Sequence, residues 1–210
     1  MGFEKIKEGF LRAKESLGKR LACNERALQK AAVFAACAYV VVLFWALWLK
    51  FNDFHMVVLN YQWLSKMTVG ERFLYDIIPF QIRFDFWNQF VQFPANAIVF
   101  APLGAILPYC FSKKNIWRDL GICFSISLAI ELTQLFTIIG NFATSDLIMN
   151  TLGYFVGFAF YRWILSKLSL QKTVWFYRIV NALLLITVGV AIVTTVCNRE
   201  LIYAILTRTL

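Results

Sequence analysis

The sequence predicts an all-α integral membrane protein, a bundle of about five transmembrane helices preceded by a basic amphipathic helix. Of its 210 residues, 60% are hydrophobic and 17% are aromatic, whereas soluble domains are roughly 45 to 50% apolar. The charged residues, moreover, collect between long uncharged runs. Apolar runs bounded by charged loops are typical of helices that cross a bilayer.

The first thirty residues are polar and basic, and their apolar residues recur at steps of three and four. These residues are Phe3, Ile6, Phe10, Ala13, Leu17 and Leu21. This is the period of an amphipathic helix. We expect residues 1–30 to form a cytoplasmic helix that lies on the membrane surface or packs on the protein's own loops.

The rest of the chain, residues 31–210, is predicted to form one membrane domain. Spans are expected at about 31–49, 94–111, 120–139, 146–165 and 179–197, each near the ~20 residues that cross a bilayer. An outer loop of residues 50–90 joins the first two. Within that connection, Phe86–Phe93 is expected to approach the membrane interface as a separate segment.

The distribution of basic residues predicts the orientation. Fifteen Lys and Arg residues fall on the side of the N-terminus and six on the other side. By the positive-inside rule the N-terminus is cytoplasmic and the C-terminus extracellular, as five spans also require. Because the net charge of +9 is divided among separate loops, it does not indicate nucleic-acid binding.

Several kinds of site are not indicated. The five cysteines occur singly, without a CxxC pair or histidine at ligand spacing, so we predict no disulfide framework, no metal site and no cofactor. His55, the only histidine, is interpreted as a loop residue. No hydrolytic triad is visible.

Polar residues interrupt the third and fourth spans, where a lipid-facing helix would carry leucine. They are Glu131, Gln134, Asp146 and Asn150. A charged side chain at mid-bilayer costs roughly 3 kcal/mol, so such residues are candidates for function. At 100° per residue, Ser127 shares one narrow stripe with Glu131 and Gln134. We therefore predict a polar cluster.

The two interrupted spans are expected to be antiparallel neighbours, since only about seven residues join them. Their polar stripes would then face each other near the outer surface, where Asn96 lies at the same depth. Gly153 and Gly157 share the polar face of the fourth span and permit close helix packing. Pro102 is predicted to kink the second span, and Gly104 is assigned to packing.

Structural roles are alternatives for the same residues. Asp146 is a candidate helix cap, and Gln134, Asn150 and Asn96 are candidates for interhelical hydrogen bonding. A buried acid needs a partner, protonation or water. As a hypothesis, Arg83 or Arg72 from the outer loop pairs with Glu131 or Asp146.

Four motifs between about residues 76 and 160 resemble those of the VanZ-like family of small membrane proteins. They are IPF at 78–80, Asn96 with FAPLG at 100–104, IELTQL at 130–135 and DLIMNTLG at 146–153. The sequence departs from the family pattern at Gly140, where relatives usually have Arg, and at Ala143, where they have an acid. It also has Asp76 where Asn is common.

The resemblance implies a bacterial plasma-membrane protein of the cell envelope, similar to a protein that lowers susceptibility to teicoplanin-type lipoglycopeptides. We favour a non-enzymatic binding function. Surrounded by membrane lipids, an outer polar cleft would engage a lipid-linked cell-wall precursor, a lipoglycopeptide antibiotic or a partner protein. Two alternatives remain: a membrane hydrolase or transferase using Glu131 and Asp146 as an acid and base pair, and a proton-coupled transporter.

Overall fold

The structure is a computed structural model that describes the backbone of residues 2–48, 61–80, 86–138, 140–198, 200 and 203, and the side chains of these ranges outside 2–22, 48 and 86–90. Its elements are α1 (Gly2–Trp48), α3 (Val69–Tyr75), α4 (Phe86–Cys110), α5 (Ile116–Thr137), α6 (Thr144–Trp163), the 3-10 turn η1 (Leu165–Lys167) and α7 (Leu170–Cys197). Within the described residues there is no strand, only an isolated bridge between Asp76 and Ala143. The predicted all-α fold is confirmed.

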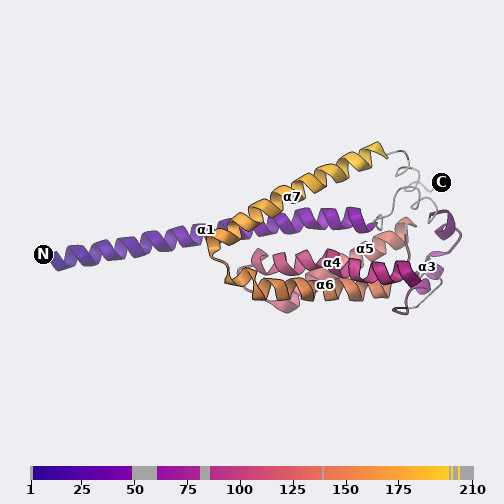
Figure 1. The fold of residues 1–210 in the computed structure, drawn as a ribbon, viewed down its shortest axis with the longest axis horizontal. Coiled ribbons are helices and arrows are strands. Elements are labelled where there is room, and N and C mark those ends of the chain that lie inside the picture. The colour runs from indigo at the N-terminus through magenta and orange to yellow at the C-terminus, as the bar shows by residue number, and fades with distance from the viewer. Residues whose placement is uncertain are drawn as a thin grey trace.

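The five long helices run along one common direction, and each is antiparallel to the long helix before it (Figure 1). α4, α5 and α6 lie together, α7 packs on α1, and the N-terminal half of α1 projects beyond the bundle (Figure 1). The short helix α3 lies at the opposite end, where α1 ends and α4 begins. The two ends of the bundle therefore differ, since the N-terminal half of α1 projects from one end and α3 lies at the other.

Four of the described helices are long and apolar enough to cross a membrane: α1 over Cys23–Leu47, α4 over Val91–Cys110, and all of α5 and α7. The protein is thus a helical membrane bundle. α6, which we predicted as the fourth span, runs alongside α4 (Figure 1) but is not among these four. Five of its first eight residues, TSDLIMNT, are polar, so the count of five spans stays a prediction.

The N-terminal region differs from expectation. We predicted an amphipathic helix over 1–30 separate from the first span, whereas Gly2–Trp48 is one unbroken helix, about 70 Å long at 1.5 Å per residue. The physical reason lies in the sequence after Gly18, which contains no glycine or proline to interrupt a helix up to Trp48.

α4 is also longer than predicted. The segment 86–93, expected as a separate interfacial approach, is the first part of the same helix, and Pro94, Pro102 and Pro108 all lie inside it. Each proline removes one backbone donor, and membrane helices tolerate this because neighbouring groups satisfy the freed carbonyls. The kink at Pro102 stays a prediction.

α4 and α6 pack backbone against backbone. A Cβ on Gly153 would overlap the carbonyl oxygen of Ala97, and one on Gly157 would overlap that of Ala101. Likewise, a Cβ on Gly104 of α4 would overlap the carbonyl oxygen of Tyr154 of α6. The two glycines of α6 therefore bring it against α4, as small residues do where membrane helices approach closely.

Three side-chain hydrogen bonds link α7 to α1 and α4. The indole Nε1 of Trp45 donates to Thr195 Oγ1 (3.1 Å), and Asn181 Nδ2 donates to the carbonyl of Ala31 (3.1 Å). Tyr177, which is fully buried, donates to the carbonyl of Ala105 (3.2 Å). The rest of α7 is largely exposed within the chain.

Candidate functional site

A small polar cavity of about 40 Å³ lies among α4, α5, α6 and the end of α1. Its lining comprises Leu47, Gln92, Ala95, Asn96, Glu131, Gln134, Asp146 and Asn150. Five of the residues that we predicted for the polar cluster thus meet in one place, although they come from three helices. Their role in ligand binding stays a prediction.

Glu131 links α5 to the start of α6. Its side chain is 2% exposed, and Oε2 accepts a hydrogen bond from the backbone N–H of Ala143 (2.9 Å). Ala143 occupies the N-cap position of α6 and its own side chain provides no cap. The carboxylate of Glu131 therefore lies at the positive end of the α6 dipole and satisfies a backbone donor there.

Asp146 was a candidate for the N-cap residue of this helix, and that prediction was wrong. α6 begins two residues before Asp146, at Thr144, so Asp146 lies in its first turn and Ala143 is the N-cap residue. A negative charge in the first turn is still favourable near the helix N-terminus. Asp146 is half-buried and lines the cavity.

Two buried amides join the helices around the cavity. Gln134 Nε2 donates to the carbonyl of Leu47 at the end of α1, and Asn150 Nδ2 donates to Ser127 Oγ (2.8 Å). The second bond connects α6 to α5, so the predicted polar stripes do face each other. Gln134, in contrast, reaches α1, a partner that helical phase alone did not indicate.

The amide oxygens of these two residues determine what the cavity can accept. Gln134 Oε1 and Asn150 Oδ1 are buried and have no hydrogen-bond partner among the residues that the structure describes. The carboxylates of Glu131 and Asp146 add further acceptor oxygens. Unsatisfied buried acceptors call for a donor such as water or a ligand, so the cavity favours hydrogen-bond donors.

The size of the cavity limits the ligand group that fits inside. One water needs about 10 to 15 Å³ of such space, so ~40 Å³ holds about three waters. Pockets that enclose a whole drug-sized ligand measure roughly 300 to 1,000 Å³. In this conformation the cavity admits one small group, such as a hydroxyl or an ammonium.

The segment before α4 covers the loop between α5 and α6. Asp76 Oδ2 accepts a hydrogen bond from Asn141 Nδ2 (3.2 Å), and the carbonyl of Asp76 accepts one from the N–H of Thr144 (3.2 Å). The rings of Phe73 and Phe142 pack with centroids 5.0 Å apart. Asp76 thus helps to hold the start of α6.

α3 begins with a capping box. The Glu71 carboxylate accepts hydrogen bonds from the N–H of Thr68 (2.7 Å) and from its hydroxyl (2.8 Å), and these bonds lower the pKa of Glu71. The next residue, Arg72, is 2% exposed and donates from Nη1 to the carbonyl of Leu64 (3.2 Å). Arg83 and His55 lie outside the described residues, so the hypothesis that Arg83 or Arg72 pairs with the acids stays a prediction.

At Gly140 and Ala143, where the resemblance led us to expect an arginine and an acid, the backbone N–H groups make hydrogen bonds to α5. The N–H of Gly140 donates to the carbonyl of Gln134 (3.3 Å), and the N–H of Ala143 donates to Glu131. The main chain at these two positions therefore contacts Gln134 and Glu131, the two residues of α5 that line the cavity.

Comparison with known proteins agrees with the motifs. The family model described as VanZ/LLP1 matches residues 36–166, more than half of the chain. The chain belongs to the VanZ/LLP1 family. Protein VanZ from Enterococcus faecium is 28% identical over 123 residues, which is 59% of this chain and 68% of that protein. No solved structure matches significantly. The match to the VanZ/LLP1 family includes α3 to α6 and ends before α7.

Sequence reasoning missed a second polar cluster at the other end of the bundle. Asp119 is 1% exposed, and its Oδ1 accepts hydrogen bonds from Arg118 Nε (2.9 Å) and Nη2 (2.6 Å). The guanidinium of Arg118 also lies 3.6 Å from the ring centroid of Phe111. Of these residues, only Arg118 had been used in the sequence analysis, as one of the basic residues that predict orientation. The available signal was Asn115, a helix N-cap residue just before them.

Proposed function

We propose that this VanZ-family membrane protein is a non-enzymatic binding protein of the bacterial plasma membrane. It would lower susceptibility to teicoplanin-type lipoglycopeptides by binding a lipid-linked envelope molecule or the lipoglycopeptide itself. The observation that carries the proposal is the cavity with two buried, unsatisfied amide oxygens. Such acceptors favour a ligand that supplies O–H or N–H donors.

The ligand would enter this site with only one group. A hydroxyl or ammonium fits the ~40 Å³ cavity, while the bulk of the molecule remains at its edge. Gln92 is exposed and Asp146 half-buried at that edge, so both are available to contact the larger part of the ligand. Selectivity would then come from the position of a donor group rather than from enclosing the whole molecule.

The basic residues support an extracellular position for the cavity. Its lining residues lie at the end of α1, in the first half of α4, in the second half of α5 and in the first half of α6. This end of the bundle is opposite the connection from α4 to α5 that contains Lys113 and Lys114 (Figure 1). Since basic loops are retained in the cytoplasm, the polar cavity would face the outer leaflet. Lipid-linked envelope intermediates and lipoglycopeptides are accessible from that leaflet.

Glu131→Gln tests the proposal with little disturbance of the fold, because a glutamine oxygen can still accept the N–H of Ala143. Removing the charge should weaken the binding of a donor ligand about tenfold, since hydrogen bonds to charged groups contribute roughly 1.5 to 3 kcal/mol. Ligands that co-purify with wild type and variant would be compared by native mass spectrometry, together with teicoplanin susceptibility of cells. Ser125→Ala, an exposed change on the same helix, is the matched control.

Each outcome separates the candidate functions. A co-purified ligand that is lost in Glu131→Gln and retained in Ser125→Ala supports the binding function. A ligand that remains bound while its chemical conversion stops identifies an enzyme using Glu131 and Asp146. Proton-coupled flux in proteoliposomes that depends on Glu131 identifies a transporter. Binding unaffected by simultaneous replacement of Glu131, Gln134, Asp146 and Asn150 contradicts the proposed site.

A further inference from the structure

A larger cavity of about 410 Å³ lies at the opposite end of the bundle, between α1 and the connection from α4 to α5. Its lining includes two cations, Arg26 and Lys114, one carboxylate, Glu25, and the neutral polar side chains of Gln29, Ser112 and Tyr109. The cavity therefore combines a net positive charge with neutral hydrogen-bond donors. Both are features of sites for phosphate.

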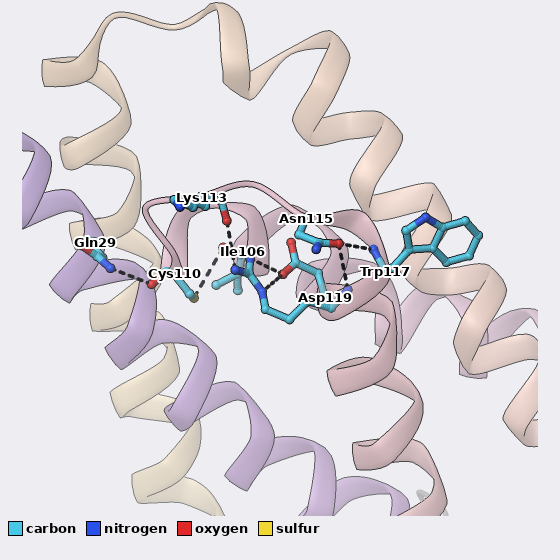
Figure 2. Close-up of polar contacts among 8 residues, drawn as sticks. Gln29, Ile106, Cys110, Lys113, Asn115, Trp117 and Asp119 are labelled. Atoms are coloured by element: carbon cyan, nitrogen blue, oxygen red, sulfur yellow. Dashed lines mark hydrogen bonds and ion pairs between the residues drawn. The ribbon is translucent and has the colours of Figure 1, made fainter.

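The wall of this cavity is held by hydrogen bonds that do not depend on a ligand. Gln29 Nε2 donates to the carbonyl of Cys110 (3.0 Å) and so ties α1 to the end of α4 (Figure 2). Arg118, paired with the buried Asp119, donates from Nη1 to the carbonyl of Lys113 (2.9 Å) (Figure 2). The loop that presents Lys114 is therefore fixed at both of its ends.

The same loop is fixed a third time where α5 begins. Asn115 Oδ1 accepts hydrogen bonds from the backbone N–H groups of Trp117 (3.0 Å) and Arg118 (3.2 Å) (Figure 2). Next to it, the ammonium of Lys114 lies 5.1 Å from the ring centroid of Tyr161 on α6. The cation is thus positioned by the fold and remains at the cavity.

Exposed tryptophans indicate that this end of the bundle lies at the level of lipid headgroups. Trp117 at the start of α5 is 77% exposed, Trp163 at the end of α6 is 71% exposed, and Trp175 near the start of α7 is 56% exposed. All three are on helix ends at the same end of the bundle (Figure 1). Tryptophan is enriched at the membrane interface, so the cavity opens where phospholipid phosphates lie.

We propose that this cavity binds the headgroup of an anionic phospholipid in the leaflet on the basic side of the bundle. Arg26 and Lys114 contact the phosphate, and Ser112 and Gln29 offer hydrogen bonds to it. Basic pockets between membrane helices on the cytoplasmic side bind such headgroups. The position among interfacial tryptophans favours a lipid over free phosphate, since a lipid is present there at high local concentration.

The test measures binding of phosphatidylglycerol to the full chain in detergent by native mass spectrometry, with phosphatidylcholine, a zwitterion of zero net charge, as the reference. Arg26→Gln and Lys114→Gln should each weaken phosphatidylglycerol binding about fivefold, the effect of one basic residue near a membrane surface. Lys167→Gln and Lys172→Gln remove the same charge from exposed positions at this end that do not line the cavity. They should change binding less than twofold.

Glu25→Gln provides a change in the opposite direction. Removing the carboxylate from the lining should strengthen phosphatidylglycerol binding several-fold, a result that damage to the fold would not produce. Equal losses in the two control variants, or unchanged binding after Arg26→Gln combined with Lys114→Gln, would overturn the proposal. Displacement of the lipid by inorganic phosphate at millimolar concentration would also overturn it, because the site would then serve a soluble phosphate.

Discussion

α6 and α7 are both long helices that the sequence predicts as membrane spans, yet they are held in opposite ways. The most apolar window of α7 has a mean hydropathy of 2.4 and is only 11% buried. α6 is too polar to qualify by the same criterion, and it carries Asn150, Gly153 and Gly157, all buried against α4 or α5. The helix that looks least like a membrane span lines the candidate site.

The physical reason is that lipid is as apolar as leucine, so apolar surface alone does not hold two membrane helices together. Helices associate there through close backbone contact and hydrogen bonds, and α6 provides both. α7 instead displays apolar side chains to lipid and uses a few anchors, such as Tyr177 and Asn181. High hydropathy therefore reports exposure to lipid and not importance for packing.

The largest difference is expected from adding one methyl group to each helix. Gly157→Ala places a Cβ against the backbone of Ala101, where neither helix can yield, and should lower the free energy of unfolding by about 3 kcal/mol. Gly189→Ala in α7 meets no atom within 4 Å and should have an effect within about 0.5 kcal/mol. Unfolding in mixed detergent micelles measures both, and equal effects would contradict the packing comparison.

A smaller difference is expected between Asn150, which is buried in α6, and Asn181, which is half-buried in α7. Asn150→Ala removes the hydrogen bond to Ser127 and should cost about 1.5 kcal/mol, near the upper limit measured for such bonds in membranes. Asn181→Ala removes the bond from α7 to Ala31 and should cost about 0.6 kcal/mol, the average value. The same unfolding measurement applies. A larger loss for Asn181→Ala would mean that α7 is held more firmly than its exposure indicates.

The smallest effects are expected from removing one tyrosine hydroxyl from each helix, and here the change in α7 should be the more destabilising of the two. Tyr154 of α6 has a buried hydroxyl without a hydrogen-bond partner, so Tyr154→Phe should leave the protein as stable or slightly more stable. Tyr177→Phe removes the hydrogen bond from α7 to Ala105 and should cost about 0.6 kcal/mol. Thermal unfolding of the two variants checks the sign. Destabilisation by Tyr154→Phe would show that its hydroxyl has a water partner.

Much of the candidate site was predictable because helical phase needs only sequence. The spacing of Ser127, Glu131 and Gln134 predicted one stripe, and the short connection to α6 made the two helices neighbours, which the Ser127 to Asn150 bond confirms. The contact of Gln134 with Leu47 was not predictable. It depends on where α1 ends in space, and helical phase says nothing about a helix from another part of the chain.

The N-terminal helix shows a different limit. Its basic first half and apolar second half predict two environments, and the structure joins them in one helix. The composition of a segment indicates whether it lies in water or in lipid. Whether a helix continues from one segment to the next depends instead on the backbone, and no glycine or proline between Gly18 and Trp48 interrupts this helix.

By itself, the sequence determined that this protein is a helical membrane bundle of the VanZ type with acids and amides in its apolar spans near one end. Burial of polar groups in lipid is costly, so these residues are visible against an apolar background. The tertiary structure decided which groups meet. It assigned Glu131 to the backbone of Ala143, left the amide oxygens of two cavity-lining residues without a hydrogen-bond partner among the described residues, and built a basic cavity at the other end. Hydrogen bonds act only over about 3 Å, so which donor reaches which acceptor depends on how the helices pack.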